Sequence, residues 1–184
     1  MKEEKCIVLD FLATGYPDSR HSEPVAQAIG ASYFSLLELV VREGVSLRSE
    51  EEVYIGEGKR DKIKFIKGSL EFDDLTNFSR STLDSMIEKI VVQNEKKIVE
   101  FFNKSRMVTP RMHQIQLLPG VGKKHLIDLL QERNKKPFDS FRDINDRVKM
   151  FPDVVKTISR RVRDELAGDE KYNLFVYKPK KREF

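Results

Sequence analysis

The stretch Leu118-Pro119-Gly120-Val121-Gly122-Lys123-Lys124 decides how the second half of this chain folds. Glycine adopts backbone angles that other residues avoid, so two glycines around one apolar residue predict a tight reversal of the chain. A basic, amphipathic run follows, which predicts that the reversal leads into a helix. The open amides and the dipole at the start of such a helix favour an anion. We therefore expect a phosphate here, held by the amides of Gly120, Val121 and Gly122 and by the charges of Lys123 and Lys124.

These residues resemble the helix-hairpin-helix family, whose hairpin amides hold nucleic-acid backbone with little regard for base sequence. Residues 115–118 fit the first helix of that family, residues 120–122 its hairpin and residues 123–131 its second helix. Leu126 departs from the family, which usually has a small residue four positions after the second glycine. The two helices are therefore expected to lie further apart than in typical members.

The glycines admit three further interpretations. A nucleotide-binding P-loop would need glycine at position 117 and a hydroxyl residue at position 124, where this chain has Leu117 and Lys124, so that motif is excluded. A turn that serves only the packing of two core helices stays open, because Pro-Gly-x-Gly turns also occur for that reason. A hairpin that binds a protein stays open as well.

A second, degenerate copy of the hairpin follows 33 residues later. Residues 148–156 align on residues 115–123, and the apolar positions, the proline and the final lysine agree. Asp153 and Val155 replace the two glycines, so this copy is expected to keep the packing and to lose the full phosphate-holding turn. The helix after it carries cations that are expected to grip a second backbone segment, namely Lys156, Arg160 and Arg161. Two such copies around a linking helix again resemble the helix-hairpin-helix family.

The composition is that of a globular chain of 184 residues, 39% of them hydrophobic, with a net charge of +4. Residues 106–168 carry 14 Lys and Arg against 8 Asp and Glu, whereas residues 1–105 carry 15 against 19. Attraction of a polyanion is therefore expected at the hairpin half. The chain has no long apolar run and no apolar N-terminal segment, so we expect a cytoplasmic protein that does not contact the membrane.

The sequence of the N-terminal half predicts strands separated by glycine-rich turns. Strands are predicted over residues 6–12, 33–41, 52–55 and 62–66, the last two as a hairpin with a basic tip. Four short strands suggest a small barrel or half-barrel of the SH3 or OB kind. Basic residues beside an aromatic one give this hairpin a possible second nucleic-acid surface, consisting of Lys59, Arg60, Lys62, Lys64 and Tyr54.

Helices are predicted after the barrel. A capping box at Ser81 predicts one connecting helix that runs to about residue 103, and Thr109-Pro110 predicts the start of the first hairpin helix. Ser140 opens the linking helix, and the last helix begins at about Asp153 and stops at Gly168. Residues 172–177 read as a strand that returns to the N-terminal sheet, and residues 178–182 as a basic tail.

Together these elements predict an α+β protein in four segments. Residues 1–78 form a small OB- or SH3-like β-barrel, residues 79–105 a long connecting helix, residues 106–168 an all-α tandem helix-hairpin-helix domain, and residues 169–184 a final strand and basic tail. On residues 7–10, 34–40, 53–56 and 117–125, the chain resembles an archaeal family of unknown function described as predicted RNA-binding proteins. That resemblance implies an OB-like barrel with a helix-hairpin-helix part, nucleic-acid binding with RNA favoured over DNA, and ribosomal or transcription-associated partners.

Enzymatic interpretations find little support. The single cysteine, Cys6, excludes an internal disulfide and a cysteine-cluster zinc site, while His21, His113 and His125 are scattered. We expect no catalytic residue, no metal and no cofactor, although acidic clusters at residues 50–52 and 73–74 leave a magnesium-dependent nuclease open. Two non-enzymatic functions also stay open, a scaffold that docks a ribosomal or transcription protein and a structure-specific DNA-binding module.

Overall fold

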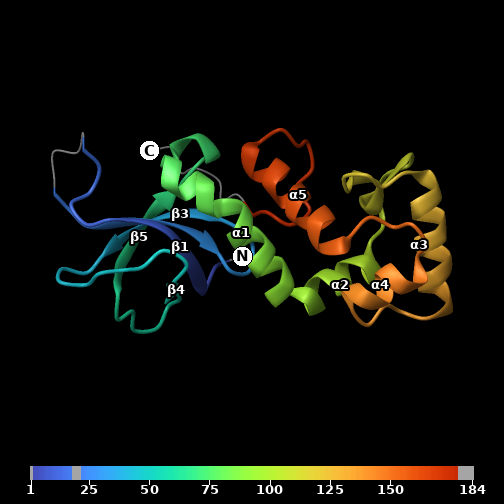
Figure 1. Cartoon of the computed structure of the whole chain (residues 1–184), viewed down its shortest axis with the longest axis horizontal. Helices are drawn as coiled ribbons and strands as arrows, with labels where there is room; N and C mark the ends of the chain where they lie inside the picture. The colour runs from blue at the N-terminus through green and yellow to red at the C-terminus, as the bar shows by residue number, and fades with distance from the viewer. Residues whose placement is uncertain (1, 18–21, 178–184) are drawn as a thin grey trace. The chain divides into compact units, whose positions relative to one another are not determined.

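A computed structural model describes residues 2–17 and 22–177 of the chain (Figure 1). These residues form two compact units, of which unit 1 comprises the chain up to Ile87 together with the residues from Asp164 on, and unit 2 comprises Glu88–Arg163. Two helices, α1 (Asn77–Gln93) and α5 (Val154–Ala167), contribute residues to both units. His21 and the predicted basic tail, residues 178–182, lie outside the described residues.

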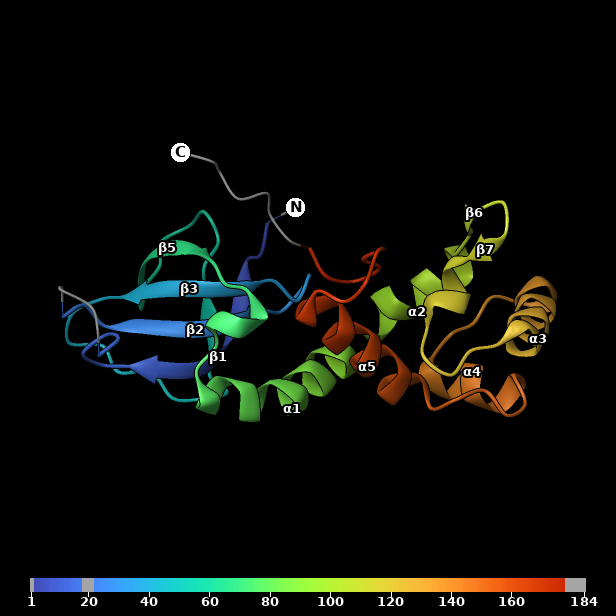
Figure 2. The same cartoon turned by 90° about the horizontal axis from the view of Figure 1, so that it is seen from above.

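Unit 1 is built on one antiparallel sheet that curls into a half-barrel, which confirms the predicted α+β class (Figures 1 and 2). Its strands follow the order β4-β1-β2-β3-β5. The bounds are β1 (Lys5–Leu12), β2 (Val25–Gly30), β3 (Leu36–Val41), β4 (Glu52–Tyr54) and β5 (Ile63–Ser69).

The central strand, β2, was not predicted, although all six of its residues are buried. Its sequence, Val-Ala-Gln-Ala-Ile-Gly, contains few β-branched and no aromatic residues, so the propensity signal was weak. Gln27 is fully buried in this strand because its side-chain amide donates to the Tyr16 hydroxyl and to the carbonyl of Asp74, both at 2.9 Å. The strand is therefore specified by partners far along the chain.

The predicted hairpin between residues 52–55 and 62–66 is wrong. The strand β4 pairs with β1, where Val53 lies opposite Cys6, and β5 pairs with β3, where Ile66 lies opposite Leu39. The two strands therefore form opposite edges of the sheet. A glycine-rich turn specifies a reversal but no partner, and the burial of Cys6, Val53 and Ile63 in one core decides the pairing.

The connecting helix is two helices. The helix α1 follows the short 3-10 helix η1 (Phe72–Asp74) and begins four residues before the predicted capping box, because the Thr76 hydroxyl accepts the Ser79 amide at 3.0 Å. The predicted continuous helix to residue 103 is interrupted at Asn94, whose side chain donates to the Ile90 carbonyl at 2.9 Å. The helix α2 (Glu95–Lys104) follows the interruption.

The predicted helix from Thr109-Pro110 is also wrong. A small hairpin lies there, β6 (Met107–Thr109) with β7 (Met112–His113), followed by the single 3-10 turn η2 (Gln114–Leu117). Proline has the fixed φ that suits both a first helical position and the second position of a tight turn, so the sequence signal was ambiguous.

Three helices complete unit 2, and the predicted caps of the last two are confirmed. They are α3 (Lys123–Lys135), α4 (Phe141–Arg147) and the first part of α5. The Ser140 hydroxyl accepts the Asp143 amide at 3.0 Å, and Asp153 accepts the Lys156 amide at 2.8 Å. Gly168, with φ of +89°, ends α5.

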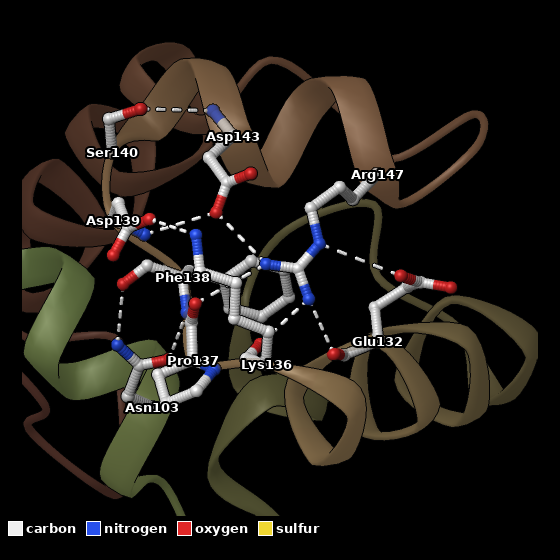
Figure 3. Close-up of polar contacts among 9 residues, drawn as sticks. All are labelled: Asn103, Glu132, Lys136, Pro137, Phe138, Asp139, Ser140, Asp143 and Arg147. Atoms are coloured by element: carbon white, nitrogen blue, oxygen red, sulfur yellow. Dashed lines mark hydrogen bonds and ion pairs between the residues drawn. The ribbon is translucent and has the colours of Figure 1, made fainter.

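Arg147 fixes the connection between α3 and α4 (Figure 3). Its guanidinium donates to the carboxylate of Asp143 at 2.9 Å and to the carbonyl of Lys136 at 2.7 Å, and it lies 4.6 Å from the centre of the Phe138 ring. Asn103 exchanges two hydrogen bonds of 2.8 Å with the backbone of Phe138. These contacts fix the turn after α3 and therefore hold α3 in place.

Residues 172–177 belong to unit 1 but form no strand, so the predicted final strand is wrong. The carboxylate of Glu165, which is fully buried, accepts the amides of Leu174, Phe175 and Val176 at 2.7 to 3.0 Å. These amides are therefore not available for a β-ladder. The segment still meets the sheet region, because the Tyr177 amide donates to the Tyr33 carbonyl at 3.0 Å.

Candidate nucleic-acid interface

The glycine bend lies on the surface of unit 2. Gly120 is exposed and has φ of +76°, the left-handed region that glycine favours, and Gly122, Lys123 and Lys124 are exposed as well. Val121 differs from these residues because it is only 9% exposed and its amide is already bonded, donating to the Leu118 carbonyl at 3.2 Å. The prediction that Val121 gives its amide to a phosphate is therefore wrong, since that donor closes the bend itself.

Open donors lie slightly further along the chain than predicted. Gly122 caps α3, and the first amide bonded to the cap carbonyl is that of Leu126, at 3.1 Å. The amide of Gly122 itself donates to His125 Nδ1 at a long 3.4 Å. Within the part of the chain that the structure describes, the amides of Lys123 and Lys124 have no intramolecular acceptor. Their side chains form no ion pair among these residues, so both charges remain available.

The bend that the sequence repeat predicts around residues 148–156 lies beside the glycine bend. Both bends are preceded by the same hydrogen bond of 3.2 Å. The Leu118 amide donates to the Ile115 carbonyl before the first bend, and the Phe151 amide donates to the Val148 carbonyl before the second. A Cβ placed on Gly120 would lie 3.5 Å from Pro152, and the rings of His125 and Phe151 meet edge to face with centres 5.9 Å apart. The two bends are therefore in contact.

The copies differ at the helix start. Asp153, which aligns with Gly120, accepts the Lys156 amide, so the second helix carries its own anion. Lys156 and Arg160 are exposed on α5, as a phosphate contact requires. Arg161 is only 2% exposed and donates to the Leu117 carbonyl at 2.9 Å. The prediction that Arg161 grips a backbone is therefore wrong, because its guanidinium braces the turn before the first bend.

The second predicted surface, in unit 1, is only partly assembled. Lys62 pairs with Glu51, and Lys64 lies 3.7 Å from Glu23, so much of the expected charge is neutralised. Lys59 is exposed. Tyr54 and Arg60 line one cavity of about 500 Å³ with Leu37, Ile66 and Tyr177, but the Arg60 Nε donates to the Gly56 carbonyl at 2.8 Å.

A groove in unit 2 has no counterpart among the sequence predictions. It has a volume of about 550 Å³, lies along α3 next to the bend, and is lined by Lys124, His125, Asp128, Gln131, Glu132, Arg147, Lys149 and Met150. These residues come from α3, from the end of α4 and from the loop before α5, and no motif connects them. Only the packing of the two hairpin copies brings them together.

Among residues 2–17 and 22–177, no group of three His, Cys, Asp or Glu residues is placed to hold a metal ion. His113 is buried, and burial together with the charge of Arg133 lowers its pKa. Its Nδ1 accepts the amide of Ile115 at 3.2 Å, so it serves as a cap for η2. Within the same residues, no helix has the length and the apolar character needed to cross a bilayer.

The fold and this surface define a mixed α+β protein of two units, with a basic, glycine-containing bend at the start of a helix. Residues 2–177 match the family model described as "Protein of unknown function (DUF655)", so the chain belongs to that family. The uncharacterized protein MJ0038 of Methanocaldococcus jannaschii is 38% identical over 171 residues, which cover 92% of this chain and 77% of the relative. The crystal structure of Af1531 from Archaeoglobus fulgidus is similar, with a TM-score of 0.85 and 43% identity over 95% of this chain and 100% of that one.

Proposed function

We propose that this protein binds nucleic acid through the phosphate backbone, without catalysis and with RNA favoured over DNA. In this proposal unit 1 is an OB-like barrel and unit 2 a tandem helix-hairpin-helix domain. The single observation that carries the proposal is the start of α3, where exposed, unbonded amides and two unpaired lysines occur at one place. Such an arrangement suits a phosphate oxygen.

The difference between the two hairpin copies supports the same conclusion. The second copy supplies a carboxylate, Asp153, to its own helix start, whereas the first has Gly120 at that position. The first helix start therefore lacks an internal anion, and an external phosphate would take its place. Lys156 and Arg160, which are exposed near the adjoining bend, add charge for the neighbouring backbone segment.

These contacts do not read the bases. Amides and flexible lysines contact the groups that every nucleotide shares, so binding should tolerate sequence and weaken steeply with salt. The preference for RNA rests on the family resemblance alone, and matched RNA and DNA ligands in one titration would decide it.

The test is the double substitution Lys123→Glu with Lys124→Glu. We expect the affinity for a short RNA to fall by about a hundredfold or more at low salt, and the slope of log K against log salt to flatten by about 0.7 to 0.9 for each lysine. The matched control is Lys96→Glu with Lys97→Glu, which places the same charges in the first turn of α2. This variant should lose much less affinity for the RNA. Fluorescence anisotropy over a salt series measures both.

Equal affinity of the parent and the Lys123, Lys124 variant would refute this assignment of residues. Retention of a partner from cell extract after nuclease treatment, with little salt dependence, would favour a protein-docking scaffold instead. Cleavage of labelled RNA or DNA by the parent protein in the presence of magnesium would show that the protein is a nuclease and would contradict the proposal of binding without catalysis.

A further inference from the structure

The groove along α3 has no role in the backbone contacts proposed above. It is lined by Lys124, whose amide is one of the open donors, and the loop that carries Lys149 and Met150 forms another wall. A strand whose phosphate lies at the start of α3 would therefore have an adjacent nucleotide close to this groove.

Met150 is the unusual side chain of that wall. It is 88% exposed and has φ of +59°, a backbone conformation that residues with a side chain rarely adopt. The loop is held in place by the neighbouring residue Phe151, which is buried. The centre of its ring lies 6.0 Å from that of Phe102 and 5.9 Å from that of His125. A strained backbone thus fixes an apolar side chain in water, where that side chain contributes nothing to the core.

The groove carries charges of both signs. Lys124, Lys149 and Asp128 all line it, and Glu132 is paired with Arg147 and Lys135. A carboxylate repels phosphate, whereas it accepts hydrogen bonds from the amino group of a base, and Gln131 can pair with a base edge. Methionine packs well on aromatic rings and is used as an apolar wedge against bases.

We propose that this groove takes one unstacked nucleobase, with Met150 packed against its face, while the adjacent phosphate lies at the start of α3. The inference rests on the proposed function and adds a ligand class to it. Bases inside a continuous duplex are stacked on both sides, so the expected ligand is single-stranded or locally opened RNA.

The experiment compares Met150→Gly and Met150→Leu with the parent protein. Glycine removes the side chain and relieves the positive φ, so thermal stability should be equal or higher. Three ligands are used: a short single-stranded RNA, the same RNA as a duplex, and a strand of the same length that lacks bases. We expect Met150→Gly to lose on the order of tenfold in affinity for the single-stranded RNA alone, with an unchanged salt slope, and Met150→Leu to keep most of the parent affinity.

Two results would overturn the inference: Met150→Gly that binds the single-stranded RNA as tightly as the parent, or a parent that binds the base-free strand as tightly as the RNA. In either case salt-dependent binding that is lost with Lys123→Glu and Lys124→Glu would leave the proposed function standing. A parent that shows no salt-dependent affinity for any of the three ligands would overturn both.

Discussion

Two adjacent arginines show how differently one residue type is used in this protein. Arg160 is exposed on α5, whereas Arg161 is buried against the Leu117 carbonyl. We expect Arg161→Ala to lower the free energy of unfolding by about 2–4 kcal/mol, because it removes a charged hydrogen bond and the packing of a long side chain. Arg160→Ala should change it by less than about 0.5 kcal/mol but weaken RNA binding. Denaturant unfolding and anisotropy on both variants check this pair, and equal stabilities would contradict it.

His113 gives the second unit a pH dependence. Its folded pKa is lowered by burial and by the charge of Arg133, while its pKa in the unfolded chain is about 6.5. Below that pH the unfolded chain binds a proton that the folded protein resists, so the free energy of unfolding should fall as the pH drops from about 7 to about 5. The variant His113→Asn, which keeps an acceptor for the Ile115 amide, should lose this component. Unfolding curves at several pH values measure it; parallel curves for the two proteins would argue against it.

At the scale of the element, the start of α3 is the feature to test. Gly122 is the N-cap, its φ of −93° is open to any residue, and a Cβ there meets nothing within 4 Å. Gly122→Asp and Gly122→Asn should therefore both keep the fold or stabilise it by a few tenths of a kcal/mol, since both cap helices well. Only aspartate puts a negative charge where the phosphate is expected. The RNA affinity of Gly122→Asp should therefore be lower than that of Gly122→Asn by more than about tenfold.

The two variants differ by one charge and almost no volume, so the comparison isolates the anion site. Similar affinities of Gly122→Asp and Gly122→Asn would show that no anion binds at this helix start. Thermal melts of both proteins provide the control for folding.

At the scale of the whole molecule, unit 1 is closed by residues from both halves of the chain. A chain ending at residue 169 would leave the buried carboxylate of Glu165 without the amides of residues 174–176. We expect it to lose about 3 kcal/mol or more, because the buried carboxylate would lose three hydrogen-bond donors. A chain ending at Tyr177 keeps these contacts and should be more stable than the shorter chain, and Glu165→Leu in the shorter chain should recover part of the loss. Thermal unfolding followed by circular dichroism measures all three; equal stability of the shorter chain and the parent would contradict this account.

The sequence alone determined what depends on neighbouring residues. The α+β class, the strands at β1 and β3, the caps of Ser140 and Asp153 and the exposed glycine bend followed from local patterns, because capping, turn formation and alternation act over a few residues. Only the tertiary structure decided the pairing of β4 and β5, the central strand β2, the burial of Arg161 and the groove beside Met150. Each of these depends on partners distant in the chain, and burial of a shared core, which no local pattern records, selects those partners.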